Sequence, residues 1–299
     1  MRPAKGFQFE TIVVATDLTQ ASDPALDYAR LIASKNGARV VLAHVIDPLS
    51  YANLADVPEK VLQGLTDEAR QKIEQLSNEL LSAGIPSHSV VRQGVVADLL
   101  LQVAEQYHAD LLILGTDRAQ GVGQVALGSV VEQVVRRANC AVLAVAADAI
   151  QPDVDHSFVG GHVLVPVQRT TASLSVLSTA QAVAAQFAGD IILLHVRTAD
   201  EIAAQLNPCA QGLSFPMTEP RVAVRCLVRD GEAAEVIAHT ATQYRVAMIV
   251  LAVNRESRHG QHGTAFEVIA NSRVPVLCVP GPRIAVAEPS PQHEVVEVC

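Results

Sequence analysis

The sequence predicts an α/β fold built from two tandem domains, each with a parallel sheet. At 299 residues, the chain is long enough for two domains of about 150 residues each. Hydrophobic residues make up 49% of the chain and aromatic residues only 3%, which is typical of parallel strands covered by helices. Apolar strand-like runs alternate with helical patterns, and the whole series occurs twice.

The first series begins with a buried strand at 11–16, which Asp17 follows directly. Pro24 then opens a helix that runs to about Asn36, and Gly37 stops it. The following elements alternate in the same way, as expected for right-handed crossovers in a parallel sheet. In chain order they are a strand at 39–45, a long helix at 58–83, a weaker strand at 89–92, a helix at 96–108, a strand at 111–114 ending on Gly115, a helix at 128–137 and a strand at 141–145.

An internal repeat defines the domain boundaries. A shift of 151 residues aligns 11–45 with 162–196 without a gap, and a shift of 137 aligns the region around Arg92 with that around Arg229. Because the shift becomes smaller between these two regions, the second copy is shorter than the first in the region of the long helix. The predicted organisation is a first domain at 1–147, a linker at 148–160, a second domain at 161–281 and a disordered tail at 282–299.

A candidate anion site lies between the strand at 111–114 and the helix that begins at Gly128 and Ser129. Gly115 allows the backbone to turn sharply or to approach a ligand closely. Gly128 and Ser129 place backbone N–H groups and a hydroxyl at a helix start, where anions are favoured. Two interpretations remain open: a phosphate cradle, or an ordinary strand-to-helix connection capped by serine.

Four features together resemble the universal stress protein family in its tandem two-domain form, over residues 9–146 and 160–280. They are the strand ending in Asp17, the strand end at His44 and Val45, the strand at 109–116, and the helix start at Gly128, Ser129 and Val130. The resemblance implies two Rossmann-like domains of the adenine nucleotide alpha hydrolase type. Each has a five-stranded parallel sheet of order 3-2-1-4-5 with helices on both faces. It also implies that the last strands, 141–145 and 276–279, pair within the chain as a pseudo-dimer; whole chains can also pair as a homodimer.

The ATP-binding branch of this family has the motif G-x2-G-x9-G-[S/T]. Gly115, position 118 and the pair Gly128-Ser129 have that spacing, but Arg118 occupies the second glycine position. A positive φ there would strain arginine by roughly 1 kcal/mol, whereas its guanidinium can bind a phosphate through two hydrogen bonds.

By resemblance, each site residue has an expected role toward ATP or a related adenine nucleotide, with or without Mg²⁺. Asp17 faces the adenosine end, Val45 flanks the base, Leu114 and Gly115 line the floor, and Gly128, Ser129 and Val130 hold the phosphates. In the second copy, Gln168 replaces Asp17 and Ala252 replaces Gly115. We therefore expect one working site, in the first domain.

Composition and motifs exclude several other functions. The net charge of −9 and the lack of a Lys/Arg cluster argue against nucleic acid as a partner. Neither a signal peptide nor a membrane-length apolar run is present, which points to the cytoplasm and to no membrane partner. The five scattered cysteines predict neither a zinc site nor a disulfide framework.

No residue suggests catalysis: there is no Walker A motif, GxGxxG motif or evident general base, so any ATP hydrolysis should be slow or incidental. Two hypotheses of function follow. One is a cytoplasmic stress-response regulator that binds a nucleotide and acts through an unknown protein partner. The other is an interaction scaffold of the same fold that binds no nucleotide. At the level of single residues, Asp17 could instead be the N-cap of the next helix, and the equivalent residues His44 and His195 are expected to be satisfied strand-end histidines.

Overall fold

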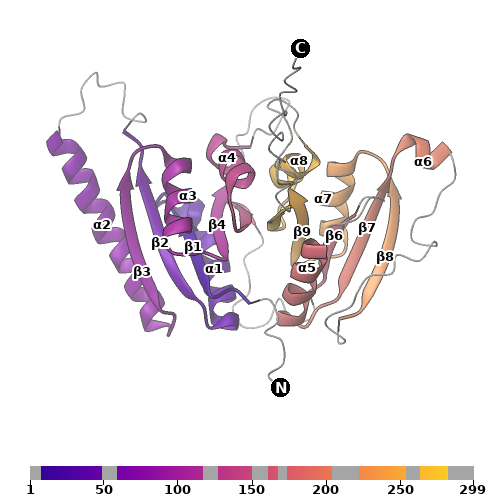
Figure 1. The fold of residues 1–299 in the computed structure, drawn as a ribbon, viewed down its shortest axis with the longest axis horizontal. Helices are drawn as coiled ribbons and strands as arrows, with labels where there is room; N and C mark the ends of the chain where they lie inside the picture. Colours follow the sequence, from indigo (N-terminus) through magenta and orange to yellow (C-terminus); the bar gives the residue numbers. More distant parts are fainter. Residues whose placement is uncertain are drawn as a thin grey trace, which may run out of the picture.

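A single ten-stranded sheet with helices on both faces forms the framework of the molecule (Figure 1). The computed structural model describes residues 8–48, 59–116, 127–149, 161–167, 174–203, 222–253 and 263–281. We refer to the described residues up to 149 as the first half and to those from 161 as the second half.

The first half alternates strands and helices in the predicted order. Its elements are β1 (Thr11–Ala15), a short 3-10 helix η1 (Gln20–Ser22), α1 (Asp23–Asn36), β2 (Arg39–Ile46), α2 (Glu59–Ser82), β3 (Ser87–Gln93), α3 (Val96–Gln106), β4 (Leu111–Thr116), α4 (Ser129–Arg137) and β5 (Ala141–Ala146). Gly37 ends α1 in the left-handed conformation, with φ 64°, as the sequence predicted.

The second half repeats this order with a shorter helix after its second strand. Its elements are β6 (Val163–Pro166), α5 (Leu174–Gln186), β7 (Ile191–Arg197), α6 (Ala199–Ala203), β8 (Val224–Asp230), α7 (Ala233–Gln243), β9 (Met248–Val253), α8 (Thr264–Asn271) and β10 (Val276–Pro280).

The strand order is β3-β2-β1-β4-β5-β10-β9-β6-β7-β8. Within each half the strands are parallel and follow the predicted order 3-2-1-4-5. The halves meet where β10 pairs antiparallel with β5, with Leu277 opposite Leu143 and Cys278 opposite Val142. The predicted pairing of the last strands within the chain is therefore confirmed.

Each face of the sheet carries its own core, because successive strand residues point to opposite faces. The α1-side core contains Ile12 and Val14 and is covered by α1, α2 and α5. The α3-side core contains Val13 and is covered by α3, α4, α7 and α8. Both cores run without a break across the two halves, so neither half has a core of its own.

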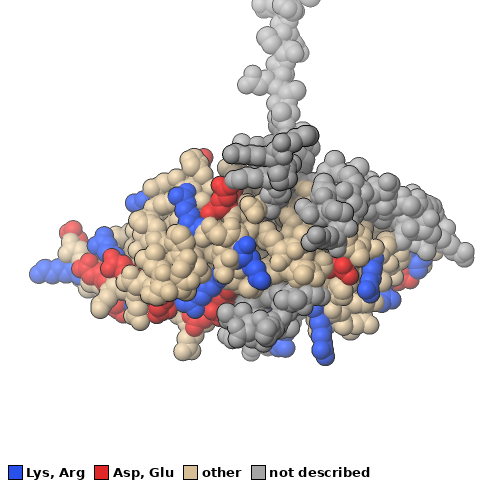
Figure 2. All heavy atoms as spheres, turned by 90° about the horizontal axis from the view of Figure 1, so that it is seen from below, with Lys and Arg blue, Asp and Glu red and all other residues tan. Residues whose placement is uncertain are grey.

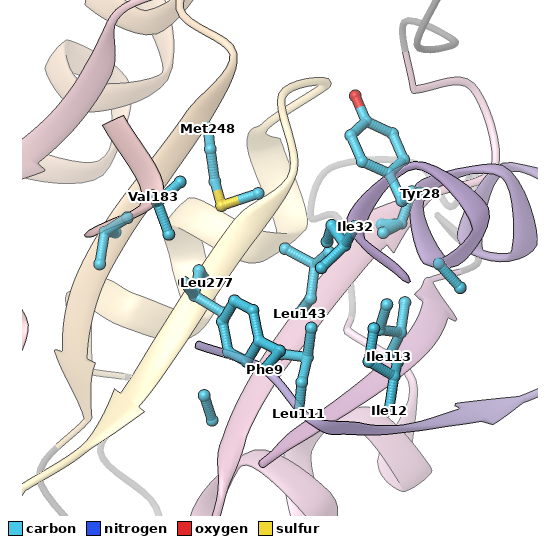
Figure 3. Close-up of a cluster of buried hydrophobic side chains, with 14 of the residues drawn as sticks. Phe9, Ile12, Tyr28, Ile32, Leu111, Ile113, Leu143, Val183, Met248 and Leu277 are labelled. Carbon is cyan, nitrogen blue, oxygen red and sulfur yellow. The ribbon is translucent and has the colours of Figure 1, made fainter. Parts of the chain in front are cut away.

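The α1-side core includes a cluster of large apolar side chains where the halves meet (Figure 3). Phe9, which is 2% exposed, lies close to Leu277 of the second half and to Leu111 and Leu143 of the first half. At the edge of this region, the side-chain amide of Asn36 exchanges hydrogen bonds with that of Gln186, at 2.8 and 3.1 Å. An ion pair at 3.0 Å between Arg273 and Asp148 adds a further contact between the halves.

Two expectations about local structure are wrong. β4 does not end at Gly115 but continues to Thr116, with Gly115 opposite Val145 of β5. Cys226 on β8 is disulfide-bonded, although the spacing of the cysteines predicted no disulfide framework. Cys140 and Cys278 are not disulfide-bonded, and burial raises the pKa of Cys278 to about 12.

Charged side chains are interspersed on the surface. On the face shown in Figure 2, Lys and Arg side chains lie singly among Asp and Glu side chains. The described residues on this face form no continuous basic stripe of the kind that is typical of nucleic-acid-binding surfaces. In the part of the chain that the structure describes, none of the helices combines the length and apolar composition of a membrane span.

The position of Phe9 where the halves meet predicts a large effect on stability. We expect Phe9→Ala to lower the free energy of unfolding by about 3–5 kcal/mol, because it leaves a cavity in the shared core. Urea unfolding measures this change. Leu81→Ala on α2 is the control: Leu81 is 51% exposed, so its loss should cost less than about 0.5 kcal/mol. Equal effects of the two substitutions would show that Phe9 is not part of a shared core.

Candidate functional site

The carboxyl ends of β1, β2 and β4 lie side by side and form the base of the candidate site. Ala15, the last residue of β1, pairs with Ala43 of β2 on one side and with Leu114 of β4 on the other. Asp17 lies two residues after Ala15, and Val45 lies two residues after Ala43. In parallel sheets, ligands bind outside the carboxyl ends of the strands, where the strand order reverses. Here the order reverses between β1 and β4.

The apolar residues predicted for the site gather on one face of the sheet. Leu114 belongs to the α3-side core, and Val45 and Val130 are partly buried against that core. Ala15 and Leu127 pack against the same core from the end of β1 and from the residue before Gly128. The structure thus brings together residues from β1, β2, β4 and α4 that are far apart in the sequence.

The loop after β1 is held by its own hydrogen bonds. Asp17 Oδ1 accepts hydrogen bonds from the backbone N–H and the hydroxyl of Thr19, at 2.9 and 2.8 Å. Leu18 has a φ of 63°, and its N–H donates to the hydroxyl oxygen of Thr16 at 3.0 Å. Thr16 Oγ1 also lies 2.8 Å from Ser22 Oγ. A left-handed leucine costs roughly 1–2 kcal/mol, so these bonds hold a strained turn at the strand end.

Asp17 does not cap a helix. Thr19 is the N-cap of η1 and accepts a bond from the N–H of Ala21, while Ser22 precedes α1. The alternative prediction that Asp17 is an N-cap is therefore wrong. Partial burial by itself raises the pKa of Asp17. The hydrogen bonds from Thr19 and Ser22 together lower it by more than burial raises it, so the pKa lies below its ordinary value. Asp17 is thus an ionised hydrogen-bond acceptor at neutral pH.

Gly115 faces away from the α3-side core. A Cβ atom at Gly115 would point toward η1 and lie 3.5 Å from the carbonyl oxygen of Ala21, which is an ordinary contact. Of the two roles predicted for Gly115, the sharp turn is wrong, because this residue has extended backbone within β4, and the close approach to a ligand stays a prediction. In the second half, Ala252 occupies the equivalent place in β9 and is exposed. The change from glycine to alanine therefore does not by itself distinguish the two halves.

The start of α4 is exposed at Gly128 and Ser129. Gly128 is the N-cap, with φ −58° and ψ 137°, and it makes no side-chain cap hydrogen bond. Ser129 is the first helical residue and is exposed, so the interpretation that serine caps this helix is wrong. No heavy atom among the described residues lies within 4 Å of a Cβ built at Gly128. An uncapped helix start with open space beside it favours an anion.

The second half differs at the helix that corresponds to α3. Glu232 is the N-cap of α7, and its carboxylate accepts the N–H of Glu235 at 3.0 Å. At the equivalent place in the first half, Val95 precedes α3 and forms no side-chain cap. The second half thus places its own negative charge at a helix start on this face, which disfavours a second anion there.

The strand-end histidines have structural partners, as predicted. His44 Nδ1 lies 2.8 Å from the carbonyl oxygen of Thr16, and His195 Nδ1 lies 3.1 Å from that of Val167. His195 Nε2 also lies 2.9 Å from Glu201 Oε2, inside the protein.

Sequence reasoning missed the role of Glu201. Its carboxylate accepts the N–H of Thr198, whose hydroxyl accepts the N–H of Glu201 in return. The spacing of Thr198 and Glu201 is that of a capping box, and this signal could have located the residue.

Several predicted features lie outside the described residues. They are Arg118, the rest of the loop at 117–126, most of the linker at 148–160, Gln168 of the second half and the tail at 282–299. A cavity of about 220 Å³ lies between the β1–α1 loop and α2, lined by Thr16, Leu18 and Leu76 among others. Leu18 and Leu76 pack on the α1-side core, so this cavity is on the opposite face from Val45 and Leu114.

The structure is that of a tandem α/β protein. Two halves with parallel strands are joined by their last strands, and a helix start without a side-chain cap lies beside the strand ends of the first half. Residues 8–146 and 161–280 match the model of the universal stress protein family. The chain therefore belongs to the universal stress protein family.

Known proteins match in two ways. Single-domain relatives match one half: Universal stress protein MJ0531 of Methanocaldococcus jannaschii is 30% identical over 142 residues, covering 46% of this chain and 82% of its own. Universal stress protein A homolog 1 of Coxiella burnetii is 30% identical over 141 residues, covering 46% of this chain and 96% of its own. The crystal structure of a universal stress protein from Archaeoglobus fulgidus covers 90% of this chain and 96% of its own, with 19% identity and a TM-score of 0.69. This last match shows that the fold of the whole tandem chain is shared.

The lowered pKa of Asp17 predicts a pH-dependent contribution to stability. A carboxylate whose pKa is lower in the folded state stabilises that state above its unfolded pKa, and the effect is lost as the pH falls through the folded pKa. We expect Asp17→Asn to reduce the free energy of unfolding at neutral pH by less than about 1 kcal/mol, because the group is partly solvated. At about pH 3.5, below the ordinary aspartate pKa, the difference should shrink.

Urea unfolding at the two pH values measures this difference. Asp67→Asn on α2 is the control, since its carboxylate is exposed and pairs with Arg70 on the same helix. If the loss of unfolding free energy in Asp17→Asn grew as the pH fell, the lowered pKa of Asp17 would be wrong.

Proposed function

We propose that the first half binds an adenine nucleotide, with ATP as the first candidate, and that this occupancy regulates a protein partner in the cytoplasm. The observation that carries the proposal is the arrangement at the strand ends. Apolar side chains and the start of α4 lie on the α3 side of one edge of the sheet, and the ionised carboxylate of Asp17 lies at the same edge, directly after β1. An adenine nucleotide needs an apolar surface for the base, an acceptor for its hydroxyl or amino groups and a site for its phosphates.

Each described residue fits one part of such a ligand. Val45 and Leu114 supply the apolar surface, and Asp17 supplies an acceptor for N–H or O–H donors. The first turn of α4, at Gly128 and Ser129, supplies N–H groups and a hydroxyl for phosphate, with the favourable end of the helix dipole. Arg118, by its place in the motif, would add a cation for the phosphates.

We expect one nucleotide per chain. The second half lacks the aspartate, because Gln168 stands in its place in the sequence. It also places the Glu232 carboxylate at the start of α7. Both differences weaken the binding of an anionic ligand to the second half. The change from glycine to alanine at position 252 has little effect on the room available for a ligand.

We also propose that the protein is a binding protein and not an ATPase. A general base is most effective when its pKa is close to the working pH. The pKa of Asp17 is lowered, and its carboxylate already accepts two hydrogen bonds from Thr19. Asp17 is therefore a weak base, and hydrolysis of bound ATP should be slow.

A matched pair of glycine substitutions tests the proposal. Gly128→Glu adds a negative charge at the start of α4, and Gly263→Glu adds the same charge at the equivalent start of α8. A Cβ fits in both places, since no described heavy atom lies within 4 Å of either. We expect Gly128→Glu to weaken ATP binding at least tenfold, or by about 1.4 kcal/mol, and Gly263→Glu to leave it unchanged.

Calorimetric titration with ATP, with and without Mg²⁺, and native mass spectrometry measure affinity and stoichiometry. ADP, AMP and cAMP in the same titration define which adenine nucleotide binds best. Two nucleotides per chain would contradict the single site. No binding at millimolar ATP by the folded protein would favour a nucleotide-independent scaffold, and binding gained only in Arg118→Gly would identify Arg118 as the reason.

A further inference from the structure

Helix α4 of the first half contacts helix α8 of the second half through one arginine. The guanidinium carbon of Arg136, in the last turn of α4, lies 4.3 Å from the ring centroid of Phe266. Phe266 lies in the first turn of α8 and is 5% exposed. This distance is typical of a cation–π interaction, and such interactions are stronger where the groups are removed from water. Figure 1 shows α4 and α8 on either side of the centre of the molecule.

A continuous series of contacts joins the start of α4 to this interaction. The N–H of Glu132 donates to the carbonyl oxygen of Gly128 at 3.1 Å, which closes the first turn. One turn further along, Glu132 Oε1 accepts hydrogen bonds from Nε and Nη2 of Arg136, at 3.0 and 2.9 Å. The side chain of Arg136 is only 18% exposed, so its orientation over Phe266 is fixed from two sides.

The end of α8 and the start of α4 cannot form an equivalent contact. Aligning Gly128 with Gly263 places Asn271 at the position of Arg136 and Val131 at that of Phe266. Asparagine has no cation, and valine has no aromatic ring. The arginine–phenylalanine pair is therefore specific to the end of α4 and the start of α8, and the equivalent positions cannot form a second one.

We propose that the Arg136–Phe266 interaction couples nucleotide binding in the first half to the stability of the first turn of α8 in the second half. The proposal rests on the proposed function, because the ligand binds at the start of α4. A ligand that orders α4 also orders the arginine that α4 carries, and the arginine restrains Phe266. The first turn of α8 is then the part of the second half that reports nucleotide occupancy, and it is a surface through which a partner can distinguish the two states.

Hydrogen exchange of the full chain, read by mass spectrometry on peptides covering 264–271, tests the coupling. We expect saturating ATP to slow exchange in this region by about fivefold, the lower end of typical coupling between two sites. Phe266→Leu removes the ring but keeps an apolar side chain and the Arg136–Glu132 pair. Arg136→Gln removes the cation. Both substitutions should abolish the slowing of exchange at α8, while ATP affinity and the protection of α4 remain. Arg136→Lys keeps a cation and should therefore retain part of the slowing at α8.

Arg137→Gln is the matched control, because Arg137 is the next residue in the same turn but pairs with Asp98 of α3 in the first half, at 2.6 Å. This variant should keep the effect of ATP on α8. If ATP slows exchange at α8 equally in Phe266→Leu and in the wild type, the proposed coupling is wrong. If ATP binds without any change at α8, the coupling is wrong and the proposed function still holds. If ATP does not bind at all in the titration, both fail together.

Discussion

The antiparallel pairing of β5 with β10 is the constraint on which the rest of the structure depends. It turns two parallel sheets into one sheet of ten strands, so that Leu143 and Leu277 of different halves face each other. Phe9 and the amide pair of Asn36 and Gln186 then fill the region between the halves. Because both cores run across this boundary, the stability of each half depends on the other. The duplicated chain thus contains within itself an interface that would otherwise have to form between separate chains.

A second feature is the way in which the strand ends hold polar groups in place. The turn after β1 contains a left-handed leucine, and Thr16 and Ser22 hold it by hydrogen bonds of their side chains. Asp17 is fixed by Thr19 in the same turn. The result is an ionised carboxylate at the end of β1, at the same edge of the sheet as the apolar ends of β2 and β4. Non-glycine residues in strained conformations are often found at ligand sites, and this one lies where a parallel sheet binds its ligands.

The two halves share a fold but have different chemistry at these ends. The second half buries a hydrogen-bonded pair of His195 and Glu201, and it caps α7 with the carboxylate of Glu232. His195 and Glu201 satisfy one another inside the protein, whereas the Glu232 carboxylate lies at the surface and occupies the start of α7. In the first half, Asp17 at the end of β1 and Ser129 at the start of α4 are exposed. The contact from Arg136 to Phe266 provides a physical link between the two halves.

The sequence by itself determined the order of the strands and helices, the duplication and the end of α1 at Gly37, because these depend on local periodicity and on the backbone preferences of neighbouring residues. Its resemblance to a family also predicted the pairing of the last strands. Only the tertiary structure decided that Gly115 points toward η1, that Asn36 pairs with Gln186 and that Arg136 lies over Phe266. These contacts depend on which face of a strand or helix meets which neighbour. That choice is made by packing between segments up to 150 residues apart, such as Asn36 and Gln186, and no local pattern in the sequence records it.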